Sequence, residues 1–102
     1  MNSPIYSSLA SDDDLREILF MYVEEMPERI VRFQQELAAR NWSELCIAAH
    51  QLKGSAGSHG FAEISNTAAE LETALKTKQP EEQITNTVQL LLDLCRRAAV
   101  EP

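Results

Sequence analysis

The sequence has few glycines, prolines and cysteines, and each scarcity argues against a class of protein. Three glycines and four prolines among 102 residues are too few for the many tight turns of an all-β domain. The two cysteines form no CxxC pair and no Cys/His cluster, so no metal site is expected. We expect Cys46 and Cys95 to be reduced, buried thiols, because both fall in helical stretches with apolar neighbours.

Long apolar runs, a targeting segment and basic residues are also lacking. The apolar runs fall far short of a membrane span, and the N-terminal MNSPIYSSLASDDD lacks the basic and apolar parts of a signal peptide. We therefore expect a cytoplasmic protein without membrane contact. Nine Lys and Arg against 16 Asp and Glu give a net charge of −7, which repels phosphate backbones. Nucleic acid is thus not an expected partner.

Apolar residues make up 44% of the chain, which suffices for the core of one small domain. Their spacing of three and four residues predicts helices throughout, and no window alternates as a strand would. The expected helices run from residue 11 to the break at Pro27, from 27 to about 40, from 41 into the 57–60 region, from 61 to 77, and from 80 onward.

The first of these helices has an N-cap in the run Ser11-Asp12-Asp13-Asp14 and an apolar face with Ile18 and Tyr22. Short links between helices favour antiparallel neighbours. The predicted fold class is therefore all-α, an up-down-up-down four-helix bundle with an additional N-terminal helix. Residues 1–10 are expected to be a flexible lead-in, and residues 11–99 to form the bundle domain.

The third expected helix carries a histidine outside its apolar face. At 100° per residue, Ala49 and Leu52 fall within about 40° of Leu45 and define the buried stripe. His50 lies about 140° from Leu45, and Ile47 about 200°. His50 is therefore expected to point at solvent, and Ile47 to belong to an exposed docking patch beside it.

Two glycines and a lysine lie on the His50 side of this helix. A glycine inside a helix costs roughly 1 kcal/mol relative to alanine, so Gly54 and Gly57 need a reason. Clearance for another molecule that approaches the imidazole is one reason, and a close helix–helix crossing at Gly54 is the alternative. Lys53 places a cation one turn from the ring, which suits a phosphoryl group.

The run His50-x-Leu52-Lys53-Gly54-Ser55-Ala56 resembles the signature of the histidine-containing phosphotransfer (HPt) domain family. The similarity extends over nearly the whole chain through an acidic first helix, the Pro27 break, the Asn41-Trp42 helix start, Gly60 and the Leu71-Glu72 pair.

The resemblance implies a role for several residues of this chain. It makes His50 the phosphorylated residue, Lys53 the cation that neutralises the phosphoryl group and Gly54 the clearance position. It also implies that Glu72 faces the histidine from the next helix. His59 falls where the family tolerates many residues, so its role stays open.

We therefore expect a phosphoryl carrier that accepts a phosphoryl group on His50 from a receiver-domain aspartate and passes it to another receiver. The nucleotide loops GxxxxGK[ST] and GxGxxG are absent, so neither ATP binding nor autonomous kinase activity is expected. No cofactor is expected either, because the magnesium of the reaction should belong to the partner receiver.

Two alternatives remain open at this point. The chain could be a non-catalytic helical adaptor that binds a receiver or kinase without being phosphorylated, which a labelling experiment distinguishes. It could also be the dimerisation domain of a histidine kinase, which needs a second chain to complete its bundle. Five helical segments can close a bundle alone, so we expect a monomer.

Overall fold

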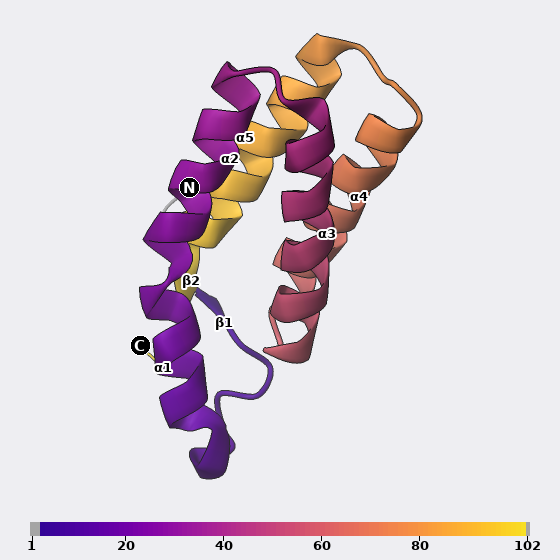
Figure 1. Ribbon diagram of the computed structural model, residues 1–102. Helices are drawn as coiled ribbons and strands as arrows, with labels where there is room; N and C mark the ends of the chain where they lie inside the picture. Colours follow the sequence, from indigo (N-terminus) through magenta and orange to yellow (C-terminus); the bar gives the residue numbers. More distant parts are fainter. Residues whose placement is uncertain (1–2, 102) are drawn as a thin grey trace.

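A computed structural model describes residues 3–101 of the chain. Its elements, labelled in Figure 1, are β1 (Ile5–Tyr6), the 3-10 helix η1 (Asp13–Leu15), α1 (Arg16–Glu24), α2 (Met26–Ala38), α3 (Trp42–Ser58), α4 (Ala62–Lys76), α5 (Glu81–Arg97) and β2 (Ala98–Ala99).

Helices α2, α3, α4 and α5 form an up-down-up-down four-helix bundle, and α1 is the additional N-terminal helix (Figure 1). In the bundle α2 contacts α3, α3 contacts α4, α4 contacts α5, and α5 contacts α2, so the four helices close around one core. Helix α1 continues beyond one end of α2. The all-α fold class predicted from the sequence is confirmed.

The core consists of the apolar residues that the helical periodicity selected. Leu45 and Leu52, predicted to be buried, are at most 3% exposed, and so are four apolar residues of the later helices and their starts: Phe61, Leu71, Val88 and Leu91. Their spacing places one face of each helix inward, and burial of these side chains supplies the main stabilisation. Among residues 3–101, no helix is both long and apolar enough to span a membrane.

Two residues expected in the interior lie nearer the surface. Ile18 is 51% exposed, because α1 extends past the bundle and buries only Leu19 and Tyr22. Cys46 is only partly buried, whereas Cys95 is buried as predicted, and both thiols are free. The spacing of apolar residues predicted the apolar face of α1. It did not predict how little of that face the bundle covers.

The helix starts follow the predicted capping residues. Within the predicted run, the side chain of Asp12 caps the first helical segment by accepting a hydrogen bond from the Asp14 backbone N–H. Pro27 lies in the first turn of α2, where a missing N–H is tolerated. Asn41 caps α3 by accepting from the Glu44 N–H.

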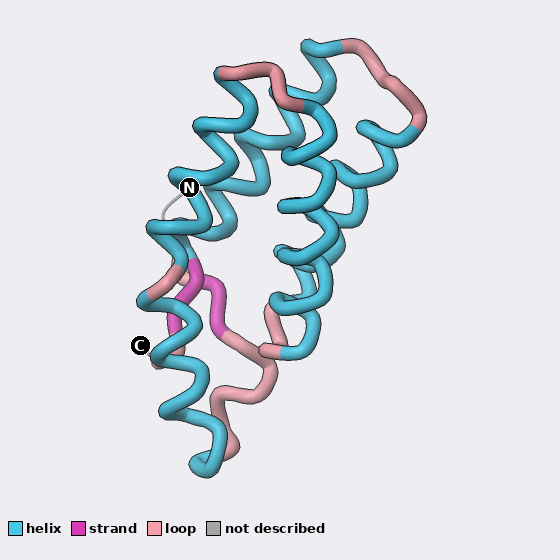
Figure 2. The backbone as a smooth tube through the Cα atoms, viewed as in Figure 1, coloured by secondary structure: helices cyan, strands magenta, loops and turns pink. Residues whose placement is uncertain are grey.

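The N-terminal segment makes contacts that the sequence did not predict. Strand β1 pairs in parallel with β2, with Ile5 opposite Ala98, so two segments from opposite ends of the sequence lie side by side (Figure 2). The backbone N–H of Ser8 donates to the carbonyl of Gly60 in the α3–α4 turn. Of the predicted lead-in, residues 5–9 therefore contact the rest of the fold.

Candidate functional site

His50 lies on the solvent side of α3, with 66% of its side chain exposed. The preceding and following turns of α3 bury Ala49 and Leu52, so the rotation of the helix directs the imidazole away from the core. One ring nitrogen, Nδ1, is 2.9 Å from Oε2 of Glu72 on α4. For the other nitrogen, Nε2, residues 3–101 supply no hydrogen-bond partner.

Glu72 is the buried centre of the site. Its side chain is 7% exposed and reaches three nitrogen atoms at hydrogen-bond distance. Lys53 Nζ donates to Oε1 at 2.8 Å, and Lys76 Nζ lies 2.8 Å from Oε2, which also contacts His50. The hydrogen bonds from Lys53 and Lys76 lower the pKa of Glu72 to about 2, against the opposing effect of burial. Glu72 is therefore ionised at neutral pH.

The ionised carboxylate determines which nitrogen of His50 carries the proton. A carboxylate oxygen only accepts hydrogen bonds, so Nδ1 must be the donor in this contact. In the neutral imidazole the lone pair is then on Nε2. Nε2 belongs to a largely exposed side chain, so the nucleophilic atom faces solvent.

Lys76 is a member of this cluster that the sequence analysis missed. It lies one turn after Glu72 on α4, and the pair has the Glu-to-Lys i,i+4 spacing that favours contact on a helix. The hydrogen bond with Glu72 raises the pKa of Lys76. The i,i+4 spacing was visible in the sequence, but its link to His50 required the position of α4 beside α3.

The two glycines of α3 have different surroundings. A Cβ atom added at Gly54 would meet no other group within 4 Å, so that position opens onto free space. A Cβ atom at Gly57 would lie 3.2 Å from Ser65 Oγ on α4. The lack of a side chain at Gly57 therefore allows α3 to lie close to α4. At Gly54 it leaves open space one turn from His50. Ile47, on the same side of α3, is 45% exposed.

His59 occupies a separate place at the C-terminal end of α3. Its ring stacks on the Tyr22 ring with centroids 4.0 Å apart, and its Nδ1–H donates to the carbonyl of Ser55 at 2.6 Å. The stacking holds the end of α3 against α1, and the hydrogen bond to Ser55 fixes the ring on its own helix, so both contacts serve packing. Within residues 3–101, no three or more His, Cys, Asp or Glu side chains gather as a metal site would require.

The protein is thus a four-helix bundle that carries an exposed imidazole on its surface. A buried carboxylate holds this imidazole, and two lysines contact the same carboxylate. The chain belongs to the Hpt domain family, whose model matches residues 17–100. No curated protein and no solved structure matches the chain.

Hpt domains are histidine phosphotransfer modules of two-component phosphorelays. They carry phosphoryl groups without being autonomous kinases, and they interact with receiver domains of response regulators or hybrid kinases. Membership in the family therefore gives the class of reaction and the class of partner.

Proposed function

We propose that this chain accepts a phosphoryl group on Nε2 of His50 from the aspartyl phosphate of one receiver and passes it to an aspartate of a second receiver. The observation that carries the proposal is the contact between His50 Nδ1 and the ionised Glu72 carboxylate. This contact leaves the lone pair of an exposed nitrogen free to attack.

In the forward step, the Nε2 lone pair of His50 forms a bond to phosphorus as the bond between phosphorus and the aspartyl oxygen breaks. The electron pair of that bond leaves with the aspartate carboxylate, and no proton has to move. The proton on Nδ1 stays in its hydrogen bond to Glu72, which stabilises the positive charge that develops on the ring. The second transfer reverses these bonds with another aspartate.

Two lysines supply charge for the transferred group. Lys53 and Lys76 both contact Glu72 and both expose part of their side chains, with 38% and 64% accessible. A lysine ammonium has three donors, so each can keep a hydrogen bond to Glu72 and offer another to a phosphoryl oxygen. Stabilisation by positioning and charge is what phosphoryl transfer requires. In our proposal the magnesium ion comes with the receiver.

The receiver docks, in this proposal, over the exposed strip of α3 that contains Ile47, Gly54 and Gly57. Clearance at Gly54 lets the aspartyl phosphate reach Nε2 in line. One chain contributes all four helices of the bundle, so we propose that the protein acts as a monomer. Cytoplasmic localisation stays a prediction from the sequence.

Phosphotransfer against the receiver domains of the source genome tests the proposal. Wild-type protein should acquire an acid-labile, base-stable label from at least one phosphorylated receiver. His50→Gln should lose the label but keep its helical content and Tm, because its exposed side chain adds little to packing. His59→Gln is the matched control and should keep the label. A receiver that binds without labelling the wild type would indicate an adaptor.

A further inference from the structure

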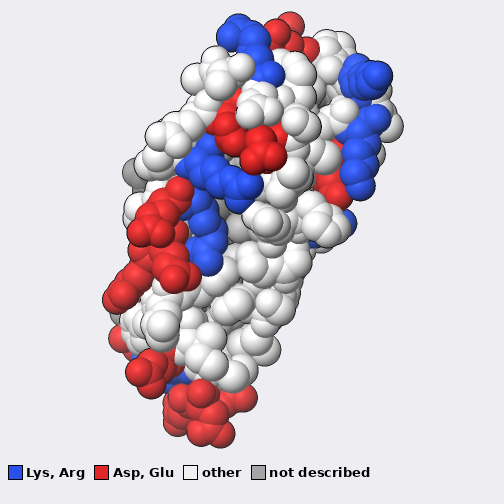
Figure 3. Space-filling view, in the orientation of Figure 1, with Lys and Arg blue, Asp and Glu red and all other residues white. Residues whose placement is uncertain are grey.

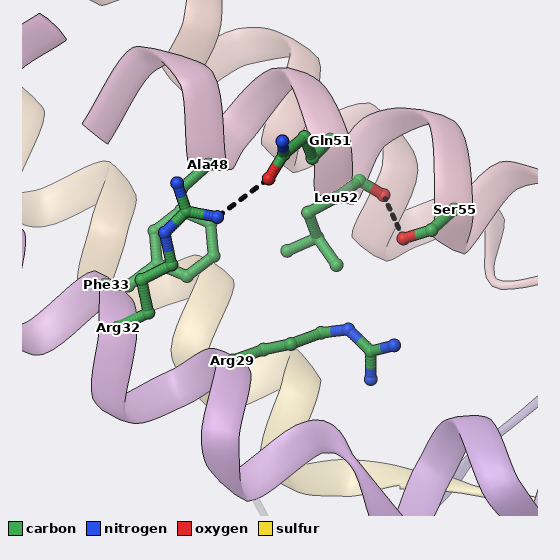
Figure 4. A pocket seen from close by; sticks show the side chains of 7 residues that line it. All are labelled: Arg29, Arg32, Phe33, Ala48, Gln51, Leu52 and Ser55. Carbon is green, nitrogen blue, oxygen red and sulfur yellow. Dashed lines mark hydrogen bonds between the residues drawn. The ribbon is translucent and has the colours of Figure 1, made fainter. Parts of the chain in front are cut away.

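A basic groove lies between α2 and α3, with a cavity of about 190 Å³. Its charged and polar lining consists of Arg29 and Arg32 from α2 and Gln51 and Ser55 from α3. Figure 4 shows Arg32 reaching from α2 to Gln51 on α3, Arg29 lying along the space between the two helices, and Leu52 pointing into that space. We call these four polar residues the arginine groove.

Arg32 differs from most other cations of the chain in its partner. Its guanidinium donates to Oε1 of Gln51 at 2.7 Å, which is a neutral amide, and residues 3–101 offer it no carboxylate within 4.0 Å. Arg29 instead pairs with Glu25 and lies over the Tyr22 ring. In a chain with a net charge of −7, Arg32 therefore keeps a partly buried positive charge that no acidic side chain neutralises.

The arginine groove borders the exposed strip of α3. On the helix wheel used above, His50 lies at about 140°, Gly54 at about 180° and Gln51 at about 240°. A molecule that covers Gly54 therefore contacts His50 on one side and the Arg32–Gln51 pair on the other. Figure 3 shows basic side chains at the centre of this face, over α2, next to an uncharged surface over α3.

We propose that the arginine groove binds an acidic side chain of the receiver and thereby helps to select the partner. The inference rests on the proposed function, because it takes the receiver as the molecule that covers Gly54. A guanidinium presents a planar pair of donors that matches a carboxylate, and Gln51 already orients the Arg32 fork. The groove has room for one side chain beside Arg32, and Phe33, Ala48 and Leu52 supply the apolar part of its lining.

Charge reversal at Arg32 tests this role, with the first receiver that labels the wild type as the probe. Arg32→Glu should raise KM for the phosphorylated receiver about tenfold or more and lower the saturating transfer rate far less, because the groove binds the partner and does not touch the reacting atoms. Arg32→Gln should give a smaller rise. Higher salt should weaken transfer to the wild type more than to Arg32→Glu.

Arg96→Glu is the matched control. Arg96 lies on α5, which is not a neighbour of α3 in the bundle, and its reversal changes the net charge by the same amount. Its KM should stay within twofold of the wild type, and melting curves establish that all variants fold. An Arg32→Glu variant that matches Arg96→Glu in KM and salt dependence would overturn the proposal. If instead neither receivers nor phosphoramidate label the wild type, the proposed function itself fails.

Discussion

At the scale of single residues, Glu72 links the chemistry of the site to the stability of the fold. One nearly buried carboxylate contacts a histidine and two lysines on two helices. Its protonation would remove the negative charge and weaken all three interactions together. At a pH low enough to protonate Glu72, we therefore expect the contacts between Glu72 and its three partners to loosen.

The pH dependence of stability should report this carboxylate. The pKa of Glu72 is about 2 in the folded protein, against an ordinary value of 4.5, so the unfolded chain binds more protons between these values. Stability from Glu72 is thus fully present above pH 4.5 and lost as the pH falls toward 2. Glu72→Gln should lower Tm at pH 6, with a deficit that shrinks by pH 3. Thermal melts of the wild type and of Glu72→Gln at each pH measure this difference in Tm. A difference that is the same at pH 6 and pH 3 would show that the pKa of Glu72 is not lowered in the folded protein.

The same residue should set the tautomer of His50. In the wild type at pH 8, ¹⁵N chemical shifts should identify Nδ1 as the protonated nitrogen of His50, because Glu72 accepts its proton. Glu72→Ala should move His50 toward a mixture of the two tautomers. His59 serves as an internal control, since its Nδ1–H donates to the Ser55 carbonyl in both proteins. An unchanged His50 spectrum would show that Glu72 does not select the tautomer.

Gly54 tests the clearance beside the histidine. Gly54→Gln should fold normally and even gain stability, because the position is open and glycine is a poor helix former. Transfer from a phosphorylated receiver should fall sharply, since the new side chain occupies the docking space. Phosphoramidate needs no docking surface and should still label His50 at a substantial fraction of the wild-type rate. Parallel loss with both donors, together with early melting, would mean that Gly54 serves packing.

At the scale of helices, the crossing of α3 and α4 brings the site together. His50 and Glu72 are 22 residues apart, and they meet because these two helices lie side by side. Gly57 permits that approach next to Ser65, whose hydroxyl donates to the Lys53 carbonyl on α3 at 2.8 Å. This hydrogen bond holds the serine oxygen in place against a larger residue at Gly57.

Alanine at the two glycines should therefore have different effects. Gly54→Ala should raise the free energy of unfolding by roughly 0.5–1 kcal/mol through better helix propensity. Gly57→Ala should fall short of that gain by about 1 kcal/mol, because its Cβ crowds Ser65. Urea unfolding measures both, and Ser65→Ala in the Gly57→Ala background should restore part of the difference. An equal increase in the free energy of unfolding for both variants would show that Gly57 is not needed for the close approach of α3 and α4.

At the scale of the whole molecule, the N-terminal segment connects the two ends of the chain with the α3–α4 turn. Strand β1 pairs with β2 after α5, and Ser7 Oγ donates to the His59 carbonyl. Arg16 forms an ion pair with Glu101, which ties α1 to the C-terminal end. These contacts cover the part of the molecule where α1 extends beyond the bundle.

Gly60 is the residue on which this closure depends. Its φ is +81°, and an added Cβ would collide with the Ser7 side chain. Gly60→Ala should therefore lower the free energy of unfolding by about 1–3 kcal/mol and expose the N-terminal segment to proteolysis. Denaturant unfolding and limited chymotrypsin digestion, which can cleave the segment after Tyr6 or Leu9, measure these effects, with Gly54→Ala as the control at an unstrained helical position. A Gly60→Ala protein as stable as the wild type would show that the segment adds little.

Much of the fold could be predicted from local patterns, because helices are built from interactions between residues three and four positions apart. The spacing of Leu45, Ala49 and Leu52 determines which face of α3 is buried and that His50 lies off it. Pro27 and Asn41 mark helix starts by their own backbone chemistry. Glu72 was identified only through the resemblance to a family, since no local rule relates it to His50.

Tertiary structure decided everything that depends on the distance between helices. Lys76 joins His50 through Glu72, and Arg32 meets Gln51, only because α4 and α2 flank α3. The different surroundings of Gly54 and Gly57 arise in the same way, from a neighbour on one side of α3 and solvent on the other. The sequence by itself determined the helices, the core and the exposed histidine. Which charged side chains surround that histidine depends on how the helices pack. Periodicity shows which face of a helix is buried, but not which residues of a neighbouring helix contact it.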